Sequence, residues 1–134
     1  MTTIEVTGLR ARPALVPLRR ALNTRVGNFT HIPMLLIDLQ TRGGVLGRVL
    51  GITFVKLGLR LVPIVLDELV AAVKGRKIGS ADIPVVHDAC QKRLSHLGHE
   101  GVTQMALSMF DMALHDAVAR EAGVPLYKLL GGTA

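Results

Sequence analysis

The spacing of apolar residues changes near the middle of the chain, and this change constrains the fold more than any other feature. Up to about residue 52, apolar side chains form short, loosely alternating runs, which are typical of β-strands. From about residue 56 onward they recur every three to four residues, as on one face of an α-helix. Strands followed by helices indicate an α+β fold, here a three-stranded antiparallel meander followed by a bundle of about three helices.

Strands are expected at residues 3–17, 32–40 and 45–52, the first interrupted or bent near Pro13. The glycine turn at residues 41–44 predicts a hairpin between the last two. Residues 17–30 combine turn-forming residues and arginines without a clear period, so they predict a long, mobile loop.

Helices are expected at residues 56–74, 85–97 and 102–122, each followed by a glycine placed to end it. Pro63 is expected either to kink the first helix or to mark its true start. Residues 78–84 are predicted to be a linker, and residues 126–130 a short helical turn. The inner face of the third helix is predicted to carry Val102, Ala106, Met109, Phe110, Ala113 and Ala117.

The composition indicates one domain, residues 1–134, with an aliphatic core, because 49% of the residues are apolar but only 3% are aromatic. The mean hydropathy of +0.41 is high for a small soluble domain and predicts surplus apolar surface that meets another domain or chain. The most apolar region, residues 44–73, contains five charged side chains, so no membrane-spanning helix is expected. Without a secretory signal, we expect a cytoplasmic protein with no membrane partner.

The net charge of +6 raises the question of nucleic-acid binding. The basic residues are scattered, and the sequence has no zinc-finger spacing and no row of aromatic residues on which bases could stack. We therefore expect no nucleic-acid partner, and salt-sensitive binding of DNA or RNA is kept as a minor alternative.

Four residues of the kinds that bind zinc lie close together in the sequence: His87, Cys90, His96 and His99. Gly98 breaks the predicted helix between the last two. We interpret the histidines as surface residues near a helix end and Cys90 as a small buried apolar residue, with a zinc site as the alternative.

Asp111 and His115 are four residues apart on the third predicted helix. They are interpreted as a helix-surface or interdomain hydrogen bond, with half of an acid–base pair as the alternative. Residues 43–47 contain three glycines, which we assign to hairpin turn geometry rather than to phosphate binding. The residues therefore predict no catalytic group and no metal ligand in this chain.

Four segments carry a wider resemblance: VTGLRAR at 6–12, VPLRRALNTRVG at 16–27, PMLLIDLQTRGGVLG at 33–47 and SMFDMALHDAVAREAGVPLYKLLGG at 108–132. In this order they resemble the N-terminal capping domain of the mandelate racemase and muconate lactonizing enzyme group of the enolase superfamily. Two residues depart from the family's pattern. His115 stands where the family usually has Trp, and Pro63 interrupts a helix normally free of proline.

The resemblance implies an enolase N-terminal domain-like fold, followed in the family by a (β/α)-barrel that is expected to be absent from this chain. Family enzymes remove the proton α to a carboxylate, and three barrel carboxylates hold the Mg2+ that stabilises the resulting enolate-like intermediate. The implied full-length relative is a Mg2+-dependent racemase, acid-sugar dehydratase or cycloisomerase. The present chain would have no cofactor of its own and would be inactive alone.

The resemblance also implies partners: a C-terminal barrel domain or other subunits, and a small carboxylate substrate. The chain is expected either to form a homo-oligomer or to be prone to aggregation. The alternative function is a stand-alone protein-interaction module that reuses the capping fold.

In the family, the first loop and the segment after the third strand form a lid over the barrel mouth, which excludes water and selects the substrate. An apolar wall there would suit an aromatic or otherwise apolar substituent. An aromatic 2-hydroxy acid, an acid sugar and a lactone all remain possible substrates. Arg20 or Arg25 is a further candidate to pair with an acidic substrate. By position, the residues expected to face substrate are Leu22, Thr24, Val26, Phe29 and Phe54.

Overall fold

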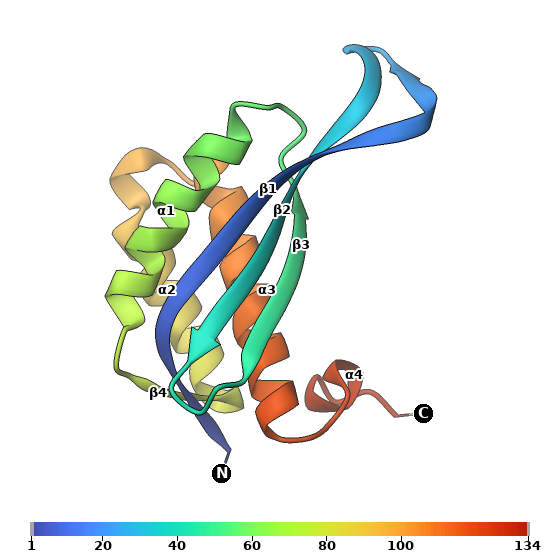
Figure 1. Cartoon of the computed structure of the whole chain (residues 1–134). Helices are drawn as coiled ribbons and strands as arrows, with labels where there is room; N and C mark the ends of the chain where they lie inside the picture. The colour runs from blue at the N-terminus through green and yellow to red at the C-terminus, as the bar shows by residue number, and fades with distance from the viewer. Residues whose placement is uncertain (1, 134) are drawn as a thin grey trace.

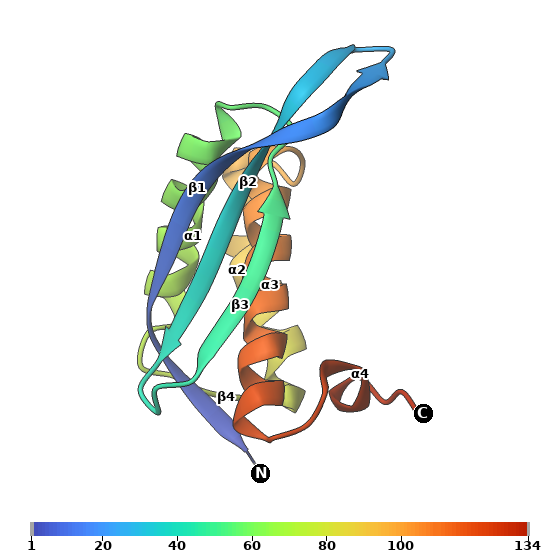
Figure 2. The same ribbon diagram turned by 45° about the vertical axis from the view of Figure 1, so that its right-hand side comes forward.

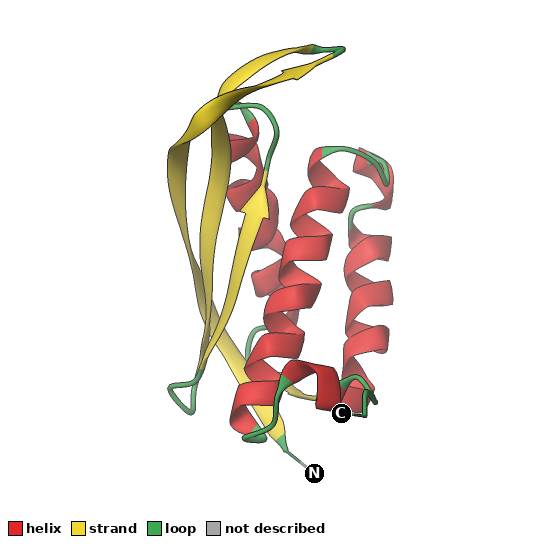
Figure 3. Ribbon diagram, turned by 90° about the vertical axis from the view of Figure 1, so that its right-hand side faces the viewer, coloured by secondary structure: helices red, strands yellow, loops and turns green. Residues whose placement is uncertain are grey.

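A sheet of four antiparallel strands forms one layer of the molecule, and the three long helices lie on one side of it (Figures 1 and 3). The computed structural model describes residues 2–133. The elements are β1 (Thr3–Thr24), β2 (Gly27–Thr41), β3 (Leu46–Ile52), α1 (Gly58–Val73), β4 (Lys77–Gly79), α2 (Ile83–Arg93), α3 (Val102–Glu121) and α4 (Leu126–Leu129), with 3-10 turns at Ser80–Asp82 and Ser95–Leu97. The strand order in the sheet is β3-β2-β1-β4. The α+β prediction is confirmed.

The predicted mobile loop at residues 17–30 is wrong, because these residues continue β1 and β2 as a long hairpin. Pairing persists to the tip, where Leu22 lies opposite Phe29 and Thr24 opposite Gly27. The register shifts between Pro17 and Leu22. In this irregular stretch the side chains do not alternate as they do in a regular strand. The turn-forming residues therefore predicted a loop where the structure has two strands. The hairpin extends well beyond the helices (Figure 2).

β1 continues through Pro13 without a break, so of the two expectations for this residue the interruption is wrong. A proline has no backbone N–H, so it fits a strand only where that group would have no partner. β4 pairs with β1 only from Thr3 to Glu5, and β1 pairs with β2 from Val6 to Pro17 and again from Leu22 to Thr24. Beyond Glu5, β1 is therefore an edge strand, which tolerates both Pro13 and Pro17.

The predicted linker at residues 78–84 is also wrong. Its beginning belongs to β4, where Ile78 pairs with Ile4, and its end belongs to a 3-10 turn and to α2. Ile78 is 1% exposed, so this short strand closes the core beside β1. The Asp82 carboxylate accepts a hydrogen bond of 2.8 Å from the Gly79 N–H and holds the chain at the entrance to α2.

The three long helices lie close to their predicted positions. α1 begins at Gly58, so Pro63 lies inside the helix and does not mark its start. Pro63 has no N–H for the carbonyl four residues before it, and the helix tolerates this loss near its beginning. The predicted turn after α3 is the short helix α4.

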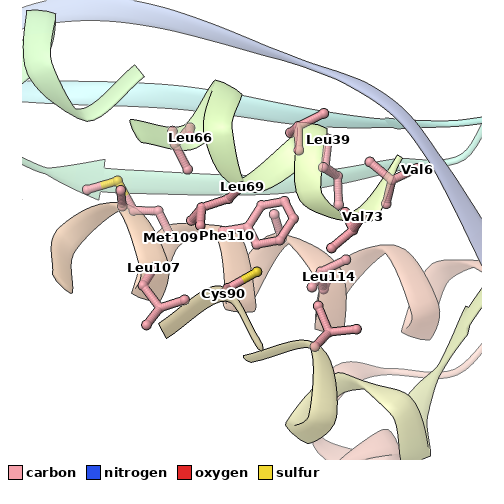
Figure 4. Packing of buried hydrophobic residues seen from close by; sticks show 14 of the residues in the cluster. Val6, Leu39, Leu66, Leu69, Val73, Cys90, Leu107, Met109, Phe110 and Leu114 are labelled. Atoms are coloured by element: carbon pink, nitrogen blue, oxygen red, sulfur yellow. The ribbon is translucent and has the colours of Figure 1, made fainter. Parts of the chain in front are cut away.

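The core lies between the sheet and the helices (Figure 4). In β2, Leu35, Ile37 and Leu39 are at most 1% exposed, while the residues between them are only partly buried. This alternation points one face of the strand at the helices. Of the six residues predicted for the inner face of α3, five are buried and Val102 is partly buried.

α3 packs closely against β3 because the inward positions of that strand are small. A side chain at Gly47 would overlap the Ala113 carbonyl of α3 and would lie 2.9 Å from the Ala117 Cβ. Gly51 lies directly against the Met109 side chain. The assignment of Gly47 to turn geometry is therefore wrong. Of the three glycines assigned to the turn, Gly44 is the one with a positive φ, at 85°.

Cys90 lies in this core and is 1% exposed. Burial raises the pKa of its thiol, which keeps the sulfur protonated and unreactive. Within residues 2–133, no helix combines the length and the hydropathy that crossing a bilayer requires.

Candidate functional site

The end of the β1–β2 hairpin and the connection from β3 to α1 come together at one end of the molecule. The structure places all five predicted substrate-facing residues around a single hollow of about 620 Å³. Leu22, Thr24, Val26 and Phe29 come from the hairpin, and Phe54 follows β3. The sequence positions alone did not show that these segments meet.

Five further residues complete the wall of this hollow, which sequence reasoning missed: His31, Ile32, Pro33, Ile52 and Val55. Each is within four residues of a predicted one, so the hairpin pairing, had it been recognised, would have pointed to them. The lining includes no Asp, Glu, Lys or Arg side chain. A hollow of this size and apolar character suits the apolar part of a small molecule.

Three of the lining side chains are strongly exposed in this domain. Val26 is 85% exposed, Phe54 65% and Leu22 53%. Large apolar groups that stay in water beside a hollow mark a surface that is buried when something binds it.

The two polar side chains in the wall have partners of their own. The Thr24 hydroxyl donates to the Gly27 carbonyl at 2.9 Å and accepts from the Val26 N–H at 3.3 Å. The Nδ1 atom of His31 lies 3.0 Å from the Thr30 Oγ1. Thr24 therefore shapes the hairpin turn, and His31 is the one ionisable side chain in the wall.

Phe54 holds a backbone conformation that is unusual for a large side chain, with φ at 60°. The neighbouring Thr53 is fully buried and fixes this bend. Its N–H donates to the Pro33 carbonyl at 3.1 Å, and its hydroxyl donates to the Val55 carbonyl at 3.0 Å. A strained residue at the wall of a hollow is a recurrent feature of functional sites.

We expect Phe54→Gly to be more stable than Phe54→Ala by about 1 kcal/mol, because only glycine adopts this φ without strain. Both variants remove the same ring from the hollow, so the comparison isolates the backbone. Urea unfolding of the two variants measures the difference. A more stable alanine variant would contradict a strained backbone at this position.

The alternative zinc site is not assembled. Cys90 is in the core, whereas His96 and His99 are exposed beyond the end of α2. Among residues 2–133, no three side chains of His, Cys, Asp or Glu converge where a metal ion could bind. The described residues therefore do not fit a Mg2+ site either, because that ion needs several oxygen ligands at one point.

Asp111, His115 and Asp116 of α3 have partners within α3 and on neighbouring elements. The Asp111 carboxylate lies 3.1 Å from the His87 Nδ1 of α2 and 3.3 Å from the His115 Nδ1. The neighbouring Asp116 accepts hydrogen bonds from the Arg48 N–H at 2.7 Å and from the Arg120 Nε at 2.6 Å. These contacts join α3 to α2 and to β3. None of these residues lines the hollow.

Residues 3–131 match the family model for the N-terminal domain of mandelate racemase and muconate lactonizing enzyme. The chain belongs to this family. The capping-domain resemblance of the four sequence segments is thus confirmed, and the hollow lies at the end of a mandelate racemase and muconate lactonizing enzyme N-terminal domain.

Solved structures with the same fold include an enolase from the alpha proteobacterium bal199 with bound Mg, which is 33% identical with a TM-score of 0.87. The match covers 97% of this chain and 35% of that one. An enolase from Bradyrhizobium, complexed with magnesium and mandelic acid, is 32% identical with a TM-score of 0.86, over 100% of this chain and 36% of that one.

An L-talarate dehydratase from Polaromonas sp. JS666, complexed with Mg and L-glucarate, is 26% identical with a TM-score of 0.79. Here the match covers 98% of this chain and 36% of that one. The chain therefore spans about a third of the length of these structures.

Proposed function

We propose that this domain is the cap of an enzyme that removes the proton α to a carboxylate, with the reacting groups and the Mg2+ ligands on a barrel domain. The single observation that carries the proposal is the hollow, which gathers ten residues from two distant segments into one apolar wall. Similar proteins hold Mg together with mandelic acid or L-glucarate, both carboxylic acids.

In this proposal, Mg2+ supplies stabilisation of the negative charge that develops on the carboxylate when it is bound on the barrel. The cap binds the rest of the substrate. Its apolar wall replaces water around the reacting carbon, which strengthens electrostatic interactions in the closed site. The wall also favours substrates with an aromatic or other apolar substituent, because a hydroxyl buried there would lack a hydrogen-bond partner.

A barrel domain also accounts for apolar side chains elsewhere on the cap. Leu126, Tyr127 and Leu130 are 39–63% exposed at the turn that follows α3. This surface suits an interdomain contact, as does the side of α3 that carries the 46% exposed Met112. The isolated domain is proposed to be inactive and to associate through these residues.

A chimaera tests the proposal directly. Residues 3–131 would replace the matching domain of the Bradyrhizobium protein, which is 32% identical. Loss of the α-proton signal of mandelate or L-glucarate in D2O would then be followed by NMR, with the parent protein measured alongside. We expect Mg2+-dependent exchange by the chimaera and none by the isolated chain. Exchange by the isolated chain would contradict the proposal.

Within the chimaera, Phe29→Ser should raise KM for mandelate about tenfold, because it removes an aromatic ring from the apolar wall. The matched control is Val85→Ser on α2, which changes a 64% exposed residue far from the hollow in sequence and outside its lining. Equal effects of the two substitutions would show that the hollow does not contact substrate. A folded chimaera without exchange activity, beside an active parent, would favour the interaction-module alternative.

A further inference from the structure

The hairpin carries a strong imbalance of charge. From Val6 to Ile37 the sequence contains five arginines and no aspartate or glutamate. The next carboxylate, Asp38, is occupied at the base of the hairpin by Arg12 at 2.7 Å and Arg48 at 3.5 Å. No acidic side chain of the hairpin itself is therefore available to neutralise the arginines nearer its tip.

Three arginines lie in the outer part of the hairpin: Arg19 and Arg20 in the irregular stretch of β1, and Arg25 in the turn. All three are exposed, and none forms an ion pair within residues 2–133. Figure 1 shows that this part of the hairpin has no helix against it. Their positive charges are thus open to an incoming molecule.

These charges lie close to the hollow along the chain. Arg25 stands between Thr24 and Val26, which both line it, and adjacent Cα atoms are about 3.8 Å apart. Arg20 is two residues from the lining residue Leu22, which is about 7 Å of extended chain. Both arginines therefore belong to the same end of the hairpin as the lining residues. Because their charges are exposed, salt is expected to weaken the attraction of an anion.

The wall of the hollow cannot attract an anion, because it is apolar and has no basic side chain other than the imidazole of His31. The arginines supply the attraction that the wall lacks. Positive groups at the edge of a low-dielectric hollow raise the local concentration of anions and speed their association.

We propose that Arg19, Arg20 and Arg25 are guide arginines that draw small carboxylate anions to the hollow. The inference rests on the proposed function for its substrate class and adds a role that the wall residues cannot perform. A small anion fits better than a nucleic acid. The hollow has the size of a small-molecule site, and the hairpin offers one aromatic ring, Phe29, instead of a row for stacking.

The test uses the 134-residue chain itself. Backbone amide shifts would be followed by NMR during titration with mandelate and with mandelamide, its neutral counterpart of nearly the same shape. At low salt we expect mandelate to shift residues around the hollow at lower concentration than mandelamide. Added salt should weaken the binding of mandelate and leave that of mandelamide unchanged.

The triple variant Arg19→Gln, Arg20→Gln, Arg25→Gln should weaken mandelate binding on the order of tenfold and leave mandelamide binding unchanged. The matched control, Lys74→Gln, Lys77→Gln, Lys92→Gln, removes the same charge from exposed positions outside the hollow. It should retain most of the preference for mandelate. Unchanged mandelamide binding distinguishes a loss of attraction from a loss of structure.

Three results would overturn the guide role: a mandelate preference that survives the arginine variant, an equal loss in the lysine control, or no preference for mandelate in the parent chain. Tight, steeply salt-dependent binding of a short DNA duplex that the arginine variant abolishes would instead assign these arginines to a polyanion. The titration does not depend on catalysis. An inactive chimaera with an intact mandelate preference would therefore reject the cap proposal alone.

Discussion

Phe110→Ala is expected to lower the free energy of unfolding by about 4 kcal/mol. Phe110 is 1% exposed and is the largest fully buried side chain within residues 2–133. It projects from α3 among residues of α1, including Leu69 and Val73 (Figure 4). Truncation of Phe110 removes an aromatic ring from the hydrophobic core and leaves a cavity that the surrounding helices and sheet cannot fill. Urea unfolding followed by circular dichroism measures the loss.

The control for this prediction is Met112→Ala, two residues further along the same helix. Met112 is 46% exposed, so its truncation removes a large apolar side chain without opening a cavity in the core. We expect a change of less than about 1 kcal/mol. Similar effects of the two substitutions would contradict the position of Phe110 at the centre of the core.

Gly47→Ala is expected to cost about 3 kcal/mol, although it adds only one methyl group. The new Cβ would overlap the Ala113 carbonyl and approach the Ala117 Cβ to 2.9 Å. Both belong to α3, and a backbone carbonyl cannot turn aside as a flexible side chain can. β3 and α3 would have to separate, which would also strain the hydrogen bond of 2.7 Å from the Arg48 N–H to Asp116. Urea unfolding measures this loss as well.

Gly43→Ala provides the matched control, since it places the same methyl group on a glycine four residues away. Its Cβ would lie 3.6 Å from the nearest atom, a Glu121 carboxylate oxygen, which is ordinary contact. Gly43 also lacks the positive φ of its neighbour Gly44. We expect its stability to stay within about 0.5 kcal/mol of the parent chain. A tolerated Gly47→Ala would show that β3 and α3 are not in close contact.

Much of the fold could be predicted because each helix carries its own signal. The apolar residues of α1 and α3 repeat with the helical period, and glycines follow their ends, so the bounds of both helices and the inner face of α3 were predicted nearly correctly. The strands of the meander were found where one face is buried, as in β2, where Leu35, Ile37 and Leu39 alternate with more exposed residues.

The strand signal failed where burial does not impose a period. The outer hairpin has no core behind it, so its residues alternate in no consistent way and resemble a loop. Its strands are held by pairing between Leu22 and Phe29 and between Thr24 and Gly27, and pairing leaves little trace in a single sequence. The three-residue β4 was missed for the same reason: Ile78 is a strand residue because Ile4 lies beside it.

The candidate site was likewise predicted only in part from the sequence. Resemblance to the family pointed to Leu22, Thr24, Val26, Phe29 and Phe54 one position at a time. The tertiary structure alone showed that they surround one hollow, and it added Ile32, Ile52 and the other neighbours that complete the wall. The positive φ of Phe54 depends on hydrogen bonds from Thr53 to the carbonyls of Pro33 and Val55, and no local sequence pattern reveals these bonds.

By itself, the sequence determined which segments form the long helices, which face of α3 is buried, and the absence of negative charge from Val6 to Ile37. These properties depend on residues near one another along the chain, so their period and composition record them. Only the tertiary structure decided that the hairpin is ordered as two strands, that Gly47 serves helix packing instead of a turn, and that the hairpin meets Phe54. Each of these depends on a contact with a residue elsewhere in the chain, and such partners become neighbours only when the core assembles.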